Sequence, residues 1–295
     1  MMRYIQQSVT ALAALMLTAA TASAAVTVGG KNFTEQLLMS EMTTQLLEDR
    51  GFSVKKADGM GSTVLRKAQI NGQVDLYWEY TGTSLVTYNK KSPKGLSAGE
   101  TIEKVRELDS EQGLTWLECS DANNTYALAV KEGADSTSDV ENLSDLAAAY
   151  NNDRELTMAV NAEFPYRDDG LVGLQETYDF RVPRGQRAPM DSGLTYSALN
   201  EGEADIALVF ATDGRIQAFD FRVLDDDKGF FPNYALCPVV RSDTLEANPK
   251  LRQPLNELAA RLDDATMQRL NARVDVDKVP MREVAQAFLE AEGLI

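Results

Sequence analysis

The sequence predicts an α/β fold of two lobes, each a mostly parallel sheet flanked by helices. Short apolar strands alternate with amphipathic helices along most of the chain, a pattern typical of parallel sheets covered on both faces. Two distant segments, 68–80 and 197–210, repeat one pattern: a helix, then Gly72 or Gly202, then an aspartate that opens an apolar strand. The roughly 270 residues after position 24 suffice for two lobes with cores of their own.

The first half of the chain begins with a strand and a long helix. We expect the strand over 26–30 and the helix over 32–50, capped by Asn32 or Thr34 and stopped by Gly51. After them the sequence predicts a strand over 52–57, a turn over 59–62, a helix over 63–71 and a strand over 74–80.

The second half repeats this alternation. It predicts strands over 126–131, 156–160 and 204–210 and helices over 140–152, 170–178 and 194–202. The C-terminal part reads as helices, because its apolar residues recur at three- and four-residue spacings. Since no low-complexity linker separates the halves, we expect the chain to cross between the lobes along strands.

The first 24 residues have the features of a secretory signal peptide. Arg3 provides a positive start, residues 11–20 form an apolar run, and "ASA" at 22–24 is a small-residue cleavage site. The run is too short for a comfortable membrane span, with an uncleaved anchor as the alternative. We therefore expect an exported chain, free in a periplasm.

Composition excludes several kinds of chemistry. The net charge of −16 disfavours nucleic acid as a partner and mildly favours cationic ligands, although a solvated acidic surface is the simpler explanation. The absence of histidine removes Ser-His-Asp and Cys-His catalysis and His-ligated zinc. Cys119 and Cys237, the two cysteines, predict one disulfide in an oxidising compartment, with two separate buried thiols as the alternative.

Candidate catalytic residues are few. Glu163, Asp168 and Asp169 lie within "EFPYRDDG", but three acids in a polar turn are more often solvated than catalytic. The acidic stretch "DDDKG" at 225–229 lacks the twelve-residue calcium-loop pattern. We therefore expect no turnover, no metal and no cofactor.

Four tyrosines fall at the ends of predicted elements. Tyr80 ends the strand over 74–80, and Thr83 starts the next helix. Tyr126 opens a strand, Tyr196 opens a helix, and Tyr234 precedes a strand running back. Ligands of open α/β sheets bind outside the carboxyl ends of the strands. A single tyrosine is more often core, but the set of four predicts a ring-lined site.

Six segments resemble successive signatures of the glycine betaine/carnitine/choline-binding proteins of osmoprotectant ABC importers. They are "VGGKNFTEQ" (28–36), "DLYWEYTGT" (75–83), "NNTYALAV" (123–130), "EFPYRDDG" (163–170), "MDSGLTYSALNEGEADI" (190–206) and "FFPNYALCPVVR" (230–241). The resemblance covers nearly the whole mature chain in order. It implies a type II periplasmic-binding-protein fold, with residues 25–128 and 214–295 in the first lobe and 129–213 in the second.

The resemblance also implies a site in which tyrosines surround a quaternary ammonium and polar groups bind the other end of the ligand. At the matching positions the cage consists of Tyr80, Tyr126, Tyr196 and Tyr234. The polar end consists of Lys31, Thr83, Arg167 and Asn124, the last at a position where some relatives carry an acidic residue. Cys119 and Tyr166 depart from residues common in that family, which leaves the rim of the site and the ligand preference open.

The implied function is that of a monomeric substrate-binding protein that delivers a quaternary ammonium solute to a membrane permease. Methylated ammonium has no N–H donor, so charge against the faces of aromatic rings is the attraction that remains. The nearest alternative keeps the fold and binds an amino acid or another small cation. A second alternative is an exported hydrolase that uses Glu163 or Asp168.

Overall fold

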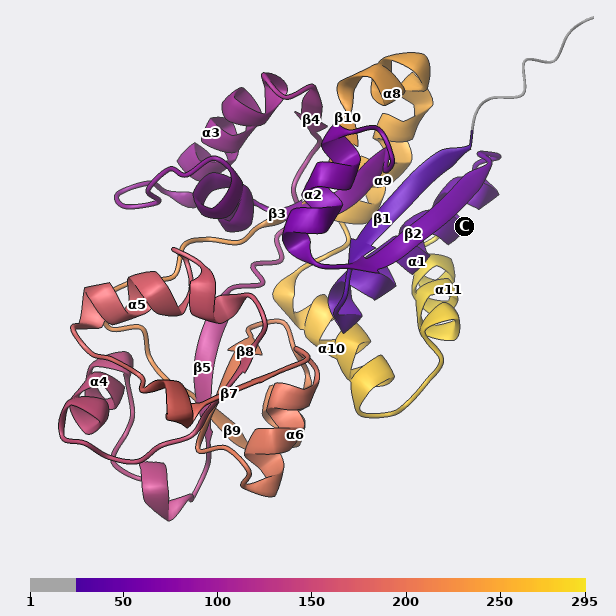
Figure 1. Cartoon of the computed structure of the whole chain (residues 1–295). Coiled ribbons are helices and arrows are strands. Elements are labelled where there is room, and N and C mark those ends of the chain that lie inside the picture. The colour runs from indigo at the N-terminus through magenta and orange to yellow at the C-terminus, as the bar shows by residue number, and fades with distance from the viewer. Residues whose placement is uncertain (1–24) are drawn as a thin grey trace, which may run out of the picture.

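The computed structural model describes residues 25–295 as two α/β lobes, each built on one five-stranded sheet (Figure 1). The predicted signal peptide, residues 1–24, lies outside the described residues. The sheet of lobe 1 has the order β2 (Val54–Met60), β1 (Val26–Lys31), β3 (Leu76–Tyr80), β10 (Leu236–Arg241), β4 (Leu114–Trp116). The sheet of lobe 2 has the order β7 (Arg187–Met190), β6 (Met158–Asn161), β8 (Ile206–Phe210), β5 (Tyr126–Lys131), β9 (Phe221–Val223).

Both sheets are mostly parallel, which confirms the predicted fold class. In lobe 1 strand β10 pairs antiparallel with β3 and β4, and the other four strands share one direction. In lobe 2 strand β5 pairs antiparallel with β8 and β9, and the other four strands share one direction. The reversed strand is in each case the one that the chain enters after crossing from the other lobe.

Helices flank both sheets (Figure 1). Lobe 1 carries α1 (Thr34–Asp49), α2 (Ser62–Ile70), the π-helical turn η1 (Thr83–Tyr88), α3 (Ala98–Ser110), α8 (Ser242–Ala247), α9 (Arg252–Ala259), α10 (Asp264–Asp275) and α11 (Met281–Ala291). Lobe 2 carries α4 (Leu143–Asn151), the 3-10 turn η3 (Phe164–Tyr166), α5 (Leu171–Tyr178), α6 (Leu194–Glu201) and α7 (Arg215–Ala218). Helices α10 and α11 pack against α1, so the C-terminal segment completes lobe 1.

The internal repeat seen in the sequence is a structural repeat. Strands β3 and β8 hold the same place in their sheets, next to the reversed strand. Asp75 accepts a hydrogen bond from the backbone of Thr27 at 2.7 Å, and Asp205 accepts one from Thr157 at 2.8 Å. The preceding glycines both have positive φ, 75° and 76°, the left-handed conformation that ends a helix without steric cost. The residues that end the two strands, Tyr80 and Phe210, are therefore structural equivalents.

Strand pairing extends lobe 2 at both ends beyond its predicted bounds, 129–213. Because β5 and β9 both pair within the sheet of lobe 2, residues 126–128 and 221–223 belong to lobe 2, whereas the sequence placed them in lobe 1. The two crossings therefore lie between β4 and β5 and between β9 and β10. A disulfide joins Cys119 to Cys237, and it ties the start of the first crossing to strand β10.

Helix α1 begins differently from the prediction. Its N-cap residue is Phe33, which makes no side-chain capping bond. Thr34, expected as a possible cap, donates its hydroxyl to Asp275 on α10 at 2.8 Å. The phenyl ring of Phe33 therefore lies at the end of β1, beside the contact between the lobes.

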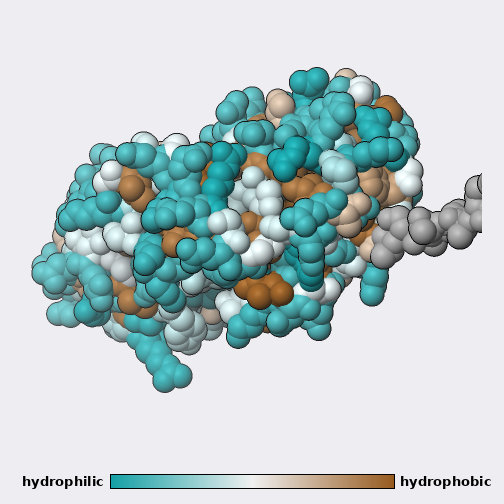
Figure 2. Space-filling model, turned by 90° about the horizontal axis from the view of Figure 1, so that it is seen from above, coloured by the Kyte–Doolittle hydropathy of each residue, from teal (hydrophilic) through white to brown (hydrophobic). Residues whose placement is uncertain are grey.

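The surface is mostly polar. The face shown in Figure 2 is largely hydrophilic, with apolar residues in small patches. No helix within residues 25–295 is long and apolar enough to cross a bilayer.

Candidate ligand-binding site

Seven of the eight predicted contact residues line one small cavity, of about 20 Å³, where the two lobes meet. Strands β1, β3 and β8 end at this cavity, with Lys31, Tyr80 and Phe210 as their last residues. This is the position at which open α/β sheets bind ligands. The lining consists of Lys31, Tyr80, Thr83, Asn124, Tyr126, Arg167 and Tyr234, with Phe33, Ser62 and Phe210 added.

Five aromatic rings form a continuous wall around this cavity, which we call the aromatic wall: Tyr80, Phe33, Phe210, Tyr126 and Tyr234. Successive ring centroids lie 6.2, 5.1, 5.3 and 5.8 Å apart in that order. Lobe 2 contributes Tyr126 and Phe210, and the other three rings come from lobe 1 or the crossing before β10. Contributions from both lobes mean that the wall is complete only when the lobes are together.

The hydroxyl groups of two of these rings donate hydrogen bonds to buried carboxylates. Tyr80 donates to Glu35 at 2.7 Å, and Tyr234 donates to Asp169 at 2.9 Å. Both carboxylates are buried, so the hydroxyls bind to protein and the rings are held in place. The second bond crosses between the lobes, because Asp169 lies on lobe 2.

Tyr196 is the predicted cage residue that the structure places elsewhere. Its ring is fully buried in the core of lobe 2, on α6, and the guanidinium carbon of Arg215 lies 3.9 Å from the ring centroid. Its hydroxyl accepts a hydrogen bond from the backbone of Phe210 at 2.9 Å. Tyr196 therefore supports the end of β8, and the ring that faces the cavity there is Phe210.

Sequence reasoning missed Phe33 and Phe210. The internal repeat was the signal for Phe210, because it aligns this residue with Tyr80. Phe33 gave no such signal, since a phenylalanine at the start of a helix is ordinarily a packing residue.

Lys31, at the polar end of the cavity, is already paired. Its ammonium forms an ion pair with Glu79, and both side chains are buried. Burial lowers the pKa of Lys31 below its ordinary value, and the neighbouring Glu79 opposes part of that shift. The ammonium also lies 4.8 Å from the centroid of Tyr80. A ligand carboxylate at this end would share Lys31 with Glu79.

Arg167 makes the matching contacts from lobe 2. Its Nε donates to Asp169 at 2.7 Å, and Nη2 lies 3.3 Å from the hydroxyl of Thr83 on lobe 1. Its guanidinium carbon is 5.3 Å from the centroid of Tyr126. Arg167 thus links the aromatic wall, the opposite lobe and a buried carboxylate.

The carboxylates considered for catalysis take part in contacts between the lobes. Glu163 accepts a hydrogen bond from the backbone of Ser62 at 2.9 Å. Asp168 is exposed and pairs with Lys90 at 3.2 Å. Tyr166, which could have added a ring, is 82% exposed and is not among the residues that line the cavity.

Glu35 was not predicted, yet it organises the other side of the cavity. It accepts hydrogen bonds from Tyr80, Asn124, Thr212 and Asn271 at 2.5 to 3.2 Å. Burial raises the pKa of its carboxyl, and the hydrogen bonds from Thr212 and Tyr80 oppose the shift. Its partners come from four separate segments, so no local motif could have revealed it.

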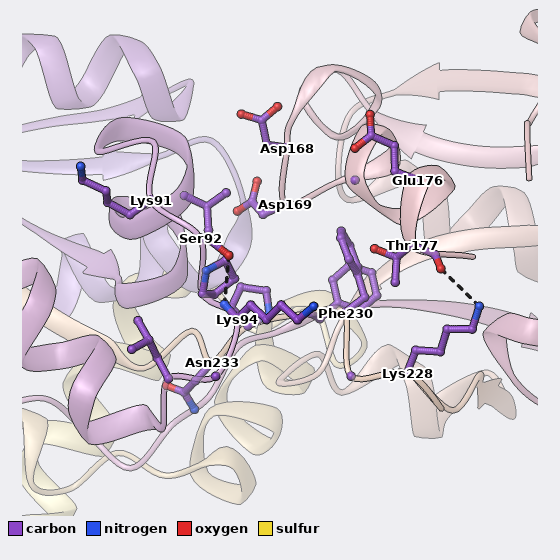
Figure 3. Close-up of a pocket in the computed structure, with 18 of the residues that line it drawn as sticks. Lys91, Ser92, Lys94, Asp168, Asp169, Glu176, Thr177, Lys228, Phe230 and Asn233 are labelled. Carbon is purple, nitrogen blue, oxygen red and sulfur yellow. Dashed lines mark hydrogen bonds between the residues drawn. The ribbon is translucent and has the colours of Figure 1, made fainter. Parts of the chain in front are cut away.

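A larger groove of about 670 Å³, with Asp169 among its lining residues, lies between η1 and α5 (Figure 3). Lys91, Lys94 and Phe230 are among the residues around it. Its lysines and acids are mostly exposed, so we treat it as a solvated groove. Within the described chain no group of three or more acidic or cysteine side chains could hold a metal ion.

Comparison with known proteins identifies similar chains over almost the full length. The family model described as the substrate binding domain of ABC-type glycine betaine transport system matches residues 24–291. A glycine-betaine-binding protein of Pseudomonas aeruginosa is 40% identical over 301 residues, covering 100% of this chain and 96% of that protein. The glycine betaine-binding protein YehZ of Escherichia coli is 32% identical over 280 residues, covering 92% of each chain.

A solved structure shows the same fold. The crystal structure of a glycine betaine/carnitine/choline ABC transporter protein superposes with a TM-score of 0.71 at 30% identity, covering 91% of this chain and 99% of that one.

Proposed function

The chain belongs to the family of substrate-binding domains of ABC-type glycine betaine transport systems, and on this premise we propose how it holds its ligand. The ligand is a quaternary ammonium solute of the glycine betaine, choline or carnitine type. Its methylated nitrogen packs against the aromatic wall between the lobes, and the closed protein delivers it to a membrane permease.

The observation that carries this proposal is the wall of five rings contributed by both lobes. A methylated ammonium has no N–H group to donate, so hydrogen-bond acceptors cannot select it. The face of an aromatic ring attracts it by about 0.5–2 kcal/mol per contact. Several such contacts account for a good part of the roughly −8 kcal/mol that corresponds to micromolar affinity.

Ligand binding and lobe closure are coupled in this proposal. Contacts between the lobes, such as the hydroxyl of Thr87 to Asp169 at 3.2 Å, already join them. A cation that touches Tyr80 on one lobe and Tyr126 on the other adds attraction that exists only in the closed form. Binding therefore shifts the population toward that form.

The polar end of the ligand meets Lys31, Thr83 and Arg167. Charge-assisted hydrogen bonds to a carboxylate are stronger than neutral ones. Because both cations are already paired with Glu79 and Asp169, a ligand carboxylate joins existing networks.

The proposal has further parts, which come from the sequence and from the resemblance. The chain acts as a monomer in the periplasm after removal of residues 1–24. It binds without turnover and needs neither metal nor cofactor, and its partner is the permease of the importer.

Calorimetric titration with glycine betaine, choline, L-carnitine and common amino acids tests the proposal. We expect at least one quaternary ammonium compound to bind with micromolar affinity. Binding of an amino acid without any quaternary ammonium compound would support the alternative ligand class and reject the proposed one.

A further inference from the structure

Helix α10 of lobe 1 contacts the segment of lobe 2 that follows strand β8. We call this the α10 contact, and it joins segment 211–215 to four residues of the helix: Gln268, Asn271, Ala272 and Asp275. Because these four positions recur at intervals of three and four residues, they lie on one face of the helix. Asp264, one turn earlier, accepts a hydrogen bond from the backbone of Asn123 in the first crossing at 2.7 Å. The face therefore runs from the crossing outward along the boundary between the lobes.

Polar interactions join the lobes at both ends of the α10 contact. Gln268 donates to the backbone oxygen of Ala211 at 2.9 Å. At the other end, the guanidinium of Arg215 lies 3.1 Å from the carboxylate of Asp275, and the two side chains are 11% and 14% exposed. Arg215 is held in place within lobe 2 by Asp213, to which its Nε donates at 2.9 Å. Since little water reaches the ion pair between the lobes, salt screens it less than it screens a surface pair.

The centre of the α10 contact is closely packed around a glycine. Gly214 has a φ of −67°, which amino acids with side chains adopt without strain. A Cβ added here would nevertheless lie 2.5 Å from the Cβ of Ala272 and 2.7 Å from the backbone oxygen of Gln268. Both atoms belong to lobe 1. A side chain at position 214 is therefore excluded by closure of the lobes and not by the fold of lobe 2.

The α10 contact adjoins the aromatic wall but does not line its cavity. The lobe 2 segment directly follows Phe210, whose ring stacks on that of Phe33 of lobe 1 with centroids 5.1 Å apart. Docking of the segment on α10 therefore positions the lobe 2 side of the wall. A second cavity, of about 140 Å³, borders both the contact and the wall. Gly214, Gln268 and Ala272 line neither cavity, so substitutions there leave the lining residues of both unchanged.

We propose that the α10 contact sets the fraction of the unliganded chain that is closed, and that it controls the overall affinity without touching the ligand. Gln268 and Ala272 on lobe 1 and Gly214 on lobe 2 are thus positioning residues. When only the closed form presents the complete wall, the apparent dissociation constant is the intrinsic one divided by the closed fraction. Weakening the contact therefore lowers the affinity for every ligand by one common factor.

The first test measures the closed fraction without any ligand. Spin labels on Glu103→Cys in lobe 1 and Glu201→Cys in lobe 2, both exposed positions, report the separation of the lobes by double electron–electron resonance. Gly214→Ala should shift the distances toward the open form, because the new methyl group meets α10 only when the lobes are closed. Gly185→Ala is the matched control in lobe 2, since a Cβ there has no atom within 4 Å, and it should keep the wild-type distances.

The second test measures affinity by calorimetry, and this part rests on the proposed function. Gly214→Ala should weaken the binding of glycine betaine and of choline by the same factor, about fivefold or more. Gln268→Ala removes an exposed side chain and its hydrogen bond between the lobes, so it should fold normally. It should weaken the binding of both ligands about 2- to 10-fold.

Three results would overturn the inference. They are wild-type distances in both Gly214→Ala and Gln268→Ala, an equal shift of the distances in Gly185→Ala, and a loss of affinity that differs between the two ligands. If the distances shift as expected and no quaternary ammonium compound binds, the proposed function is rejected and the inference stands.

Discussion

Replacing Tyr80 by leucine should weaken ligand binding without unfolding the chain. Tyr80 is 4% exposed and forms one end of the aromatic wall, with its centroid 6.2 Å from that of Phe33. Loss of one cation–π contact of about 0.5–2 kcal/mol raises the dissociation constant about 2- to 30-fold. Tyr80→Phe keeps the ring and removes only the hydroxyl that donates to Glu35, so it should change the dissociation constant by less than about twofold.

The same substitution at Tyr196 is the matched comparison. Tyr196→Leu removes a ring from the core of lobe 2 and the acceptor for the Phe210 backbone, which should lower the unfolding free energy by about 2–4 kcal/mol. Because Tyr196 does not line the cavity, affinity should fall less than in Tyr80→Leu.

Calorimetry with choline or glycine betaine measures affinity, and urea unfolding monitored by circular dichroism shows that each variant is folded. Wild-type affinity in Tyr80→Leu would refute the reasoning. An equal loss of affinity in folded Tyr196→Leu would do so as well.

Four other outcomes follow from the structure. Binding should change little between about pH 6 and pH 8, because the chain has no histidine, and a calorimetric midpoint in that range would contradict this. Burial lowers the pKa of Lys31, so its ammonium should lose its charge at a pH below the ordinary lysine pKa of 10.5. The affinity for glycine betaine should therefore begin to fall below that pH, whereas the affinity for choline, which has no carboxylate, should not. Because burial raises the pKa of Glu35, the folded chain retains a proton that the unfolded chain has released; stability should therefore decline as pH rises above 4.5, and urea titrations of Glu35→Gln should show a smaller decline. Replacing Cys119 and Cys237 by alanine opens a link across 118 residues and should lower the unfolding free energy by about 3–5 kcal/mol; an unchanged urea midpoint would argue against a stabilising disulfide.

The sequence was informative about the fold because local patterns agree with the tertiary structure. Strand β5 spans the predicted range, 126–131. Helix α5 begins one residue after its predicted start, and α6 begins at its predicted start. The repeat containing Gly72 and Gly202 pointed to two similar lobes, since both the helix end and the following aspartate are local features. The lobe boundaries were less accessible, because the pairing of β9 with β5 is a contact between distant segments.

The candidate site was predictable where a residue ends a strand and not where it depends on packing. Lys31 and Tyr80 end β1 and β3, so the carboxyl-end rule places them at the cavity. Tyr196 lies within a helix, and a motif match does not determine which face of the helix its ring occupies. Glu35 acquires its partners only when α1, β3, the first crossing and α10 come together.

The most direct test is a crystal structure of the chain with bound choline. The quaternary nitrogen should lie within about 6 Å of the ring centroids of Tyr80, Tyr126 and Tyr234, with both lobes in contact with the ligand. A nitrogen located in the groove beside Lys94 and Phe230, away from these rings, would contradict the central claim that the aromatic wall holds the cation.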